Sequence, residues 1–128
     1  FADFVKQKLF IVDNMIPDEA VPAPMNCYAG KCSFTINWQG EMRPCVILTK
    51  PATDVFKYGF ENAWNRNMEE ISKILLNAKC SACRMSPLCR TCAASALYET
   101  GNYGGVPDYM CRYTEETIRL MRKFIKEN

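Results

Sequence analysis

Hydrophobic residues recur at helical spacing in several stretches of the chain, and each stretch predicts an amphipathic helix. The first covers residues 1–12, where an apolar residue returns every three or four positions. The clearest covers residues 60–75, and we expect its single apolar stripe to pack into the core. That stripe consists of Phe60, Trp64, Met68, Ile71 and Leu75.

Two further helices are predicted in the C-terminal part of the chain. One covers residues 91–100, with Cys92 in its first turn and Gly101 as the cap that stops it. Exposed N–H groups and the helix dipole favour a thiolate at such a position. The other begins at Thr114, which is expected to act as its N-cap.

Polar and apolar residues alternate instead over residues 33–48, which predicts a β-hairpin. Gly40 can take the positive φ that a tight hairpin turn requires, so the return strand should cover residues 41–48. Pro44 either ends that strand or places it at a sheet edge. The hairpin carries Cys32 at its entrance and Cys45 on its return, and folding brings these two thiols together. The proline-rich segment before it and residues 49–57 after it are expected to be connectors.

Length and charge limit the possible functions. The 128 residues suit one small domain, and a formal net charge of +2 gives no electrostatic reason to expect nucleic acid or an anionic membrane as a partner. No apolar run is long enough to span a bilayer and no signal peptide is visible, so we expect a cytoplasmic protein. Because the chain starts at Phe1, without Met and inside a helical pattern, we expect it to be a fragment of a longer protein.

Eight cysteines and the lack of histidine are the strongest chemical signal. Without histidine the chain has no mixed Cys–His zinc site, no Cys–His nucleophile pair and no Ser–His–Asp triad. Four cysteines form the pattern C-x2-C-x5-C-x2-C from Cys80 to Cys92, in which Pro87 should force a turn. Zinc ribbons space their pairs about 15–20 residues apart, so this dense run is closer to iron–sulfur ferredoxins.

Eight thiols allow three kinds of site. Four disulfides are disfavoured by the C-x-x-C pairs and by the lack of a secretory signal. Two structural zinc sites, each with four cysteines, use the thiols equally well. Two iron–sulfur clusters fit the spacing best. Arg84 and Arg90 lie in the dense run, where they could offset the negative charge of a reduced cluster or simply face water.

The full order of cysteines resembles a known domain family. The chain reads Cys27-x12-Gly40-x4-Cys45, then the dense run from Cys80 to Cys92, then Cys111. This order resembles the SPASM domain, the twin auxiliary-cluster domain that follows the barrel in many radical S-adenosylmethionine enzymes. The resemblance implies a small α+β fold in which a short β-hairpin, several helices and long cysteine-rich loops surround two metal clusters.

The resemblance also implies how the ligands divide between two [4Fe–4S] clusters, whose thiols could hold zinc instead. The first set would be Cys27, Cys32, Cys45 and Cys92. The second set would be Cys80, Cys83, Cys89 and Cys111. The family's dense run usually ends C-x3-C, whereas only two residues separate Cys89 from Cys92 in this chain.

By the same resemblance, the chain is an auxiliary domain that transfers electrons and helps to form the substrate pocket of a peptide- or protein-modifying enzyme. Residues 1–26 would be a helix and linker leading from the barrel of the same parent chain, and residues 27–128 the twin-cluster domain. Other expected partners are a peptide or protein substrate and a flavodoxin or ferredoxin as electron donor. The alternatives are a zinc-stabilised interaction module and a free-standing ferredoxin-like carrier.

Two features bear on enzyme activity. The radical-generating C-x3-C-x2-C motif does not occur in these residues, so the chain cannot cleave S-adenosylmethionine by itself in the family's way. In anaerobic sulfatase maturases an aspartate follows the hairpin cysteine, whereas Val46 follows Cys45 here. This difference favours another peptide- or protein-modifying member of the family.

Overall fold

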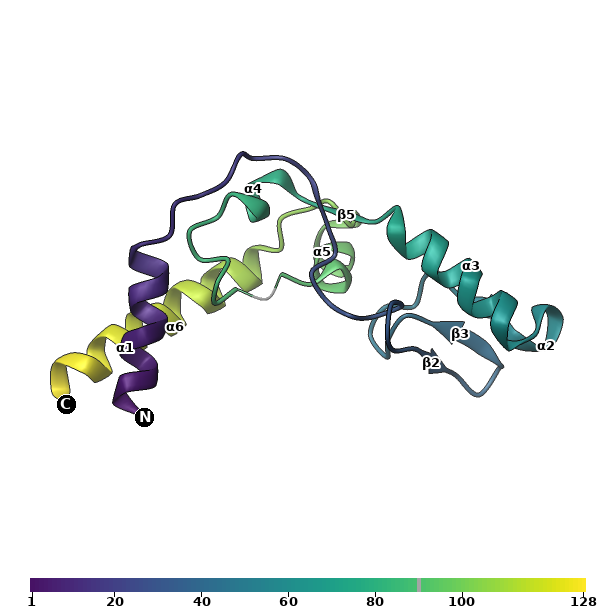
Figure 1. Cartoon of the computed structure of the whole chain (residues 1–128), viewed down its shortest axis with the longest axis horizontal. Coiled ribbons are helices and arrows are strands. Elements are labelled where there is room, and N and C mark those ends of the chain that lie inside the picture. Colours follow the sequence, from purple (N-terminus) through teal and green to yellow (C-terminus); the bar gives the residue numbers. More distant parts are fainter. Residues whose placement is uncertain (90) are drawn as a thin grey trace. The chain divides into compact units, whose positions relative to one another are not determined.

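A computed structural model of the chain describes residues 1–89 and 91–128, and its small α+β fold confirms the predicted class (Figure 1). Arg90 lies outside the described residues. In chain order the elements are α1 Ala2–Asp13, β1 Ala23–Pro24, β2 Thr35–Ile36, β3 Glu41–Arg43, β4 Thr53–Asp54, α2 Val55–Tyr58, α3 Phe60–Ser72, β5 Leu75–Leu76, α4 Ala78–Ser81, α5 Ala93–Thr100 and α6 Asp108–Glu127.

The chain divides into two compact units. The helical unit consists of Phe1–Ala23 and Leu76–Asn128, and the hairpin unit is Pro24–Leu75. The short strands β1 and β5 form a two-stranded sheet. The predicted boundary between residues 26 and 27 concerns a barrel outside this chain and stays a prediction. Among the described helices, none is both long and apolar enough to cross a membrane.

The helical unit is built on the pairing of α1 with α6. Its core contains Val5, Leu9 and Val12 from α1 and Ile118 from α6, so the predicted stripe of α1 is confirmed at these positions. Phe1 is the exception, because it is 88% exposed. Its ring nevertheless meets Phe124 edge-on at 5.4 Å between centroids.

The last helix begins earlier than predicted. Pro107 is the N-cap of α6 and Asp108 lies in its first turn, so Thr114 is an interior residue and the prediction of an N-cap there is wrong. The Thr114 side chain is buried and its hydroxyl donates to the carbonyl of Met110, 2.9 Å away. Inside a helix, a threonine hydroxyl can donate to the carbonyl four residues earlier. The presence of a threonine therefore did not locate the start of the helix. As a result, Cys111 belongs to the first turns of α6 and not to a loop.

Helix α5 follows the prediction closely. Gly101 has a φ of 76° and closes the helix in the left-handed conformation expected of a C-terminal cap. Cys92 is the N-cap residue, one position before the first turn in which it was predicted to lie. The small side chains of Ala93, Ala94 and Ala96 are buried, which seats this helix in the unit.

The hairpin unit contains a three-stranded antiparallel sheet in the order β2-β3-β4. Ile36 lies opposite Met42, and Gly40 takes a φ of 80° in the turn, as predicted. The return strand ends at Arg43 instead of residue 48, because Pro44 has no N–H to continue the ladder. Strand β4 lies in the segment that was predicted to be a connector. It has only two residues, which is too few for an alternating pattern to indicate a strand.

Helix α3 ends at Ser72, and the face it buries differs from the predicted stripe. The buried residues are Ala63, Asn67 and Ile71, a face turned roughly 60° around the axis at 3.6 residues per turn. The prediction of a core stripe is wrong for three of its members, since Phe60, Met68 and Leu75 are 51%, 40% and 45% exposed. The Asn67 amide donates to the carbonyl of Met42, 2.8 Å away, and so fastens the helix to β3.

Aromatic packing explains where the exposed part of the stripe lies. The ring of Phe34 meets those of Phe60 and Trp64 edge-on, at 5.2 and 5.6 Å between centroids. Edge-to-face pairs of this kind are favourable even near solvent. The large side chains therefore cover the margin of the sheet, while the small Ala63 allows the helix to approach its middle.

Candidate metal centre

The eight cysteines are all free thiols, and they are divided unequally between the units. The hairpin unit holds Cys27, Cys32 and Cys45. The helical unit holds Cys80, Cys83, Cys89, Cys92 and Cys111. All four members of the predicted second set therefore belong to one unit, whereas the predicted first set draws three members from one unit and Cys92 from the other.

Short α4 presents Cys80 and is fixed at its N-terminal end by the side chain of Asn77. The Asn77 side chain caps it by accepting from the backbone N–H of Lys79 at 2.8 Å. The same side chain donates to the carbonyl of Gly104, 2.6 Å away. This bond ties α4 to the loop that leads into α6, the helix that carries Cys111.

Tight turns carry the chain from Cys80 to Cys89. Backbone N–H groups donate from Cys83 to Cys80 at 3.3 Å, from Ser86 to Cys83 at 3.0 Å and from Cys89 to Met85 at 2.7 Å. These turns agree with the prediction that Pro87 forces a turn in this segment. Between the cysteines, Met85 and Leu88 pack against the core of α1 and α6. The loop is thus anchored by apolar side chains, which leaves its cysteines free for other partners.

Four thiols of this unit influence one another electrostatically. Burial raises the pKa of the Cys111 thiol, and the charges of Cys89, Cys80 and Cys83 raise it further. Burial likewise raises the pKa of Cys80, and Cys89 and Cys83 add to that rise. The N-terminal position of Cys111 in α6 acts in the opposite direction, since a helix N-terminus favours negative charge. Four thiolates so placed repel one another, and a cationic metal core would offset the repulsion.

The hydroxyl of Thr91 links two of these thiols. It lies 3.4 Å from the sulfur of Cys89, and its hydrogen bond to Cys80 lowers the pKa of that thiol, in opposition to burial. Sequence reasoning did not single out Thr91, although a hydroxyl residue inside a cysteine run is a usable signal. Arg84, one of the two arginines considered either as a counter-charge for a cluster or as a solvent-facing residue, donates to the carbonyl of Asp13 at 3.3 Å. Arg90, the other, lies outside the described residues.

In the hairpin unit a glycine packs the first cysteine loop against the residue before Cys45. Gly30 has a φ of 72°, and a Cβ built there would lie 2.8 Å from Ile71 Cγ1 and 3.4 Å from Pro44 Cβ. The N–H of Cys32 donates to the carbonyl of Tyr28 at 3.0 Å and closes the loop. Gly30, in the loop from Cys27 to Cys32, therefore lies beside Pro44, the residue that follows β3.

Cys45 accepts a hydrogen bond from the backbone. The N–H of Leu48 lies 3.2 Å from the Cys45 sulfur. Donation from an amide to sulfur stabilises a thiolate, and such bonds help to set the potential of metal–thiolate sites. This contact was also missed from sequence, because it depends on the turn that follows Pro44.

The donor set fits an iron–sulfur cluster. Thiolates are the soft ligands that such clusters use, and the chain provides them without histidine. In the part of the chain that the structure describes, no three Cys, Asp or Glu side chains converge closely enough to hold one metal ion. One zinc ion would need sulfurs within about 4 Å of each other, at about 2.3 Å per Zn–S bond. A four-iron cluster needs a wider spacing, because each thiolate binds a different iron.

Comparison with known families agrees with this chemistry. Residues 27–93 match the model of SPASM, described as an iron–sulfur cluster-binding domain. The match covers just over half of the chain and includes every cysteine except Cys111. Comparison with curated proteins and with solved structures gives no match.

Proposed function

Because the chain belongs to the SPASM family of iron–sulfur cluster-binding domains, we propose that it is the auxiliary-cluster domain of a radical S-adenosylmethionine enzyme. The observation that carries this proposal is the family match over residues 27–93, and it is supported by the location of Cys80, Cys83, Cys89 and Cys111 in one compact unit, where they influence one another electrostatically. A cluster held by these thiols would take up and release single electrons.

Two [4Fe–4S] clusters account for all eight thiols. The first would be held by Cys27, Cys32, Cys45 and Cys92. The second would be held by Cys80, Cys83, Cys89 and Cys111. The membership of Cys92 in the first set rests on the family's order of cysteines. Its position as the N-cap of α5 supports it as a thiolate ligand, since the N-terminus of a helix favours negative charge.

The remaining residues of the site support negatively charged sulfur. The amide of Leu48 donates to Cys45 and the hydroxyl of Thr91 lies against Cys89. Outer hydrogen bonds of this kind orient ligands and tune their electron density. The apolar side chains of Met85 and Leu88 hold the loop between the cysteines against the core of α1 and α6.

The parent protein would supply the radical chemistry. We propose that its barrel belongs to the same parent chain, that its substrate is a peptide or protein, and that a flavodoxin or ferredoxin delivers electrons in the cytoplasm. The chain itself would relay electrons and contribute to the walls of the substrate pocket. Val46, in the position where sulfatase maturases carry an aspartate, supports a different modification.

Metal analysis of anaerobically prepared protein tests the proposal. Two four-iron clusters predict about eight iron and about eight sulfide per chain, with the brown colour of iron–sulfur protein. A reconstituted chain that holds stoichiometric zinc and no sulfide would contradict it and would support a zinc-stabilised interaction module. Preparation in air is not a fair control, because oxygen attacks exposed clusters.

A further inference from the structure

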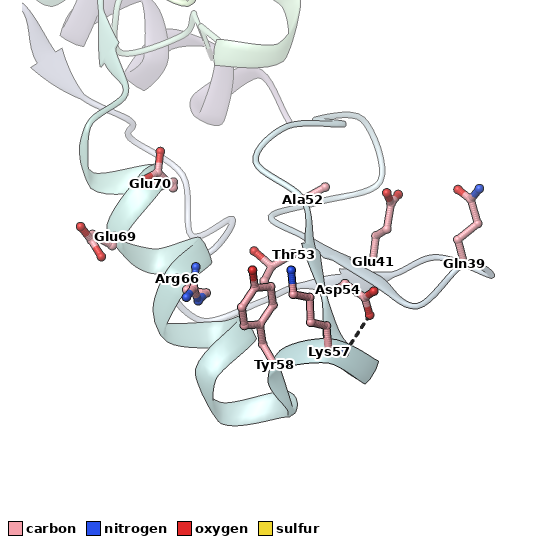
Figure 2. Close-up of a pocket in the computed structure, with 10 residues that line it drawn as sticks. All are labelled: Gln39, Glu41, Ala52, Thr53, Asp54, Lys57, Tyr58, Arg66, Glu69 and Glu70. Atoms are coloured by element: carbon pink, nitrogen blue, oxygen red, sulfur yellow. Dashed lines mark hydrogen bonds between the residues drawn. The ribbon is translucent and has the colours of Figure 1, made fainter.

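The hairpin unit contains a cleft whose lining includes no cysteine. It has a volume of about 620 Å³, within the usual range for binding sites. Figure 2 shows its lining residues, which are Gln39, Glu41, Ala52, Thr53, Asp54, Lys57, Tyr58, Arg66, Glu69 and Glu70. Because both sheet and helix residues line it, the cleft lies between β3 and β4 on one side and α2 and α3 on the other. Any function of this cleft is separate from the question of which metal the thiols bind.

Two of its carboxylates are already used by the fold on the sheet side. Glu41 accepts from the guanidinium of Arg43 at 2.7 Å and from the amide of Asn37 at 2.7 Å. The Arg43 hydrogen bond, with that of Asn37, lowers the pKa of Glu41, so this side chain stays ionised and paired. Asp54 caps α2, since its Oδ1 accepts from the backbone N–H groups of Phe56 and Lys57 at 2.8 and 3.1 Å.

The carboxylates on the helix side are also paired. Glu69 and Glu70 share Lys73, at 3.5 and 2.6 Å between nitrogen and oxygen. All three side chains are more than half exposed, so water weakens these ion pairs. The pairs still place a positive charge beside each carboxylate of α3 that reaches the cleft.

The two cations of the cleft are different, because they surround one aromatic ring. The Lys57 nitrogen lies 5.0 Å from the centroid of the Tyr58 ring, and the Arg66 guanidinium carbon lies 4.0 Å from it. Figure 2 shows the Tyr58 ring between the two cationic side chains. Within residues 1–89 and 91–128, neither cation has a carboxylate within 4.0 Å and the Tyr58 hydroxyl has no hydrogen-bond partner.

We propose that Lys57, Tyr58 and Arg66 bind a carboxylate carried by a peptide, that is, an acidic side chain of a peptide or protein. The ammonium and the guanidinium offer a ligand only donors and positive charge, and the phenol adds an O–H donor. The planar guanidinium also matches a carboxylate in shape. Stacking on Tyr58 holds both cations in place before the ligand arrives, which lowers the entropy that binding must overcome.

The walls of the cleft favour a peptide over a free anion. Three consecutive residues, Ala52, Thr53 and Asp54, line the cleft, and two of them form β4, an edge strand of its sheet. The backbone groups on the outer side of an edge strand can pair with an extended peptide. Gln39 and Thr53 add neutral polar side chains that suit a peptide backbone. A small inorganic anion would use the cations and leave this wall without partners.

Peptide binding to the full, anaerobically prepared chain tests the site. The probes are acetyl-Gly-Glu-Gly-Glu-Gly-amide and its counterparts with Gln or Lys in place of Glu, with inorganic phosphate as a fourth probe. Saturation-transfer NMR would give the affinity of each. We expect the Glu peptide to bind and the Gln and Lys peptides to bind at least about tenfold more weakly, because a charge-assisted hydrogen bond is worth about 1.5–3 kcal/mol.

Three variants locate the interaction. Lys57→Gln and Arg66→Gln should each weaken binding of the Glu peptide by about tenfold, and Tyr58→Phe should weaken it less, since it loses one neutral donor. Lys8→Gln is the matched control, because Lys8 lies 5.4 Å from the Phe4 ring in α1, outside the cleft. Circular dichroism would verify that each variant keeps its helix content.

Several outcomes would overturn the inference. If Lys57→Gln and Arg66→Gln both bind the Glu peptide as tightly as the unaltered chain does, the two cations take no part in binding. Tighter binding of the Lys peptide would make the cleft an acidic site instead. Tighter binding of phosphate than of the Glu peptide would show a small-anion site, in which the backbone wall plays no part.

Discussion

The helical unit and the hairpin unit hold their cysteines in different ways. In the helical unit, Cys83 and Cys89 flank a loop whose apolar side chains enter the core of α1 and α6. In the hairpin unit, Cys32 and Cys45 lie in turns that depend on Gly30 and Pro44. One set is anchored by burial of apolar surface, and the other by the conformation of a few backbone residues.

This difference also affects how complete each set is. The helical unit contains four thiols that act on one another electrostatically, which is enough for one cluster. The hairpin unit contains three thiols, so a four-iron cluster there needs a ligand from another part of the protein. We therefore expect the second cluster to depend only on its own unit and the first to depend on both.

Replacement of single cysteines tests this division and should give the largest effect. Cys111→Ala is expected to remove the same cluster as Cys80→Ala, and Cys92→Ala the same cluster as Cys45→Ala, because each cluster loses one of its four ligands. Each variant should lose about half of the iron, or about four of eight atoms. Iron analysis together with electron paramagnetic resonance of the reduced protein would identify which signal disappears.

One result would change the proposed ligand sets. If Cys92→Ala removes the signal that Cys80→Ala removes, the dense run from Cys80 to Cys92 is a four-cysteine site by itself. The two-residue spacing between Cys89 and Cys92, shorter than the family's usual three, would then have altered the ligand sets. Cys111 would in that case not be a cluster ligand, and the Cys111→Ala variant would keep all of its iron.

The sequence predicted the elements that carry strong local signals and missed those set by tertiary contacts. The turn at Gly40 and the cap at Gly101 were correct, because positive φ is a demand that glycine meets locally. The start of α6 was wrong, since Thr114 bonds within the helix it was expected to begin. The apolar stripe of α3 was misplaced because Asn67, a polar residue, is buried by its bond to Met42.

The same distinction holds for the metal centre. Cysteine spacing indicated iron–sulfur chemistry, and the alternation of polar and apolar residues indicated a hairpin expected to bring Cys32 toward Cys45. The anchoring of the cysteine loop by Leu88 could not be predicted, because it depends on which helix pair covers that loop. The bonds from Leu48 and Thr91 to sulfur were missed for a similar reason, since each depends on a turn of irregular backbone. Residue type indicated the chemistry, whereas tertiary packing set its surroundings.

Truncation of Leu88, which anchors the loop between Cys83 and Cys89, should have an effect of intermediate size. We expect it to be confined to the helical unit. Leu88 is partly buried against the core of α1 and α6, so Leu88→Ala should lower the free energy of unfolding by about 1–2 kcal/mol. It should also speed the loss of iron from the second cluster to a chelator, because the loop between Cys83 and Cys89 opens more often. Chemical denaturation and the time course of iron release would measure the two effects.

A leucine on the surface of the same unit gives the control. Leu120 lies in α6 and is 49% exposed, so Leu120→Ala should change both quantities much less. Equal acceleration of iron loss from both clusters in Leu88→Ala would contradict the contrast between the units. It would mean that the two sets of thiols share one anchor.

The smallest expected effect concerns the hydroxyl that lies against Cys89. A hydrogen bond to sulfur stabilises the more negative, reduced form of a cluster, so Thr91→Val should lower the reduction potential of the second cluster. With about 0.5–1.5 kcal/mol for the bond and 59 mV per tenfold change for one electron, the shift is roughly 20–60 mV.

Thr91→Ser keeps the hydroxyl and should restore most of the potential. Thr117→Val is the control for loss of a hydroxyl, because Thr117 donates to the carbonyl of Tyr113 within α6. Potentiometric titration of each loaded variant separates the outcomes. An unchanged potential in Thr91→Val would show that the hydroxyl only packs against the sulfur, and a shift of the first cluster instead would place Thr91 beside the other set of thiols.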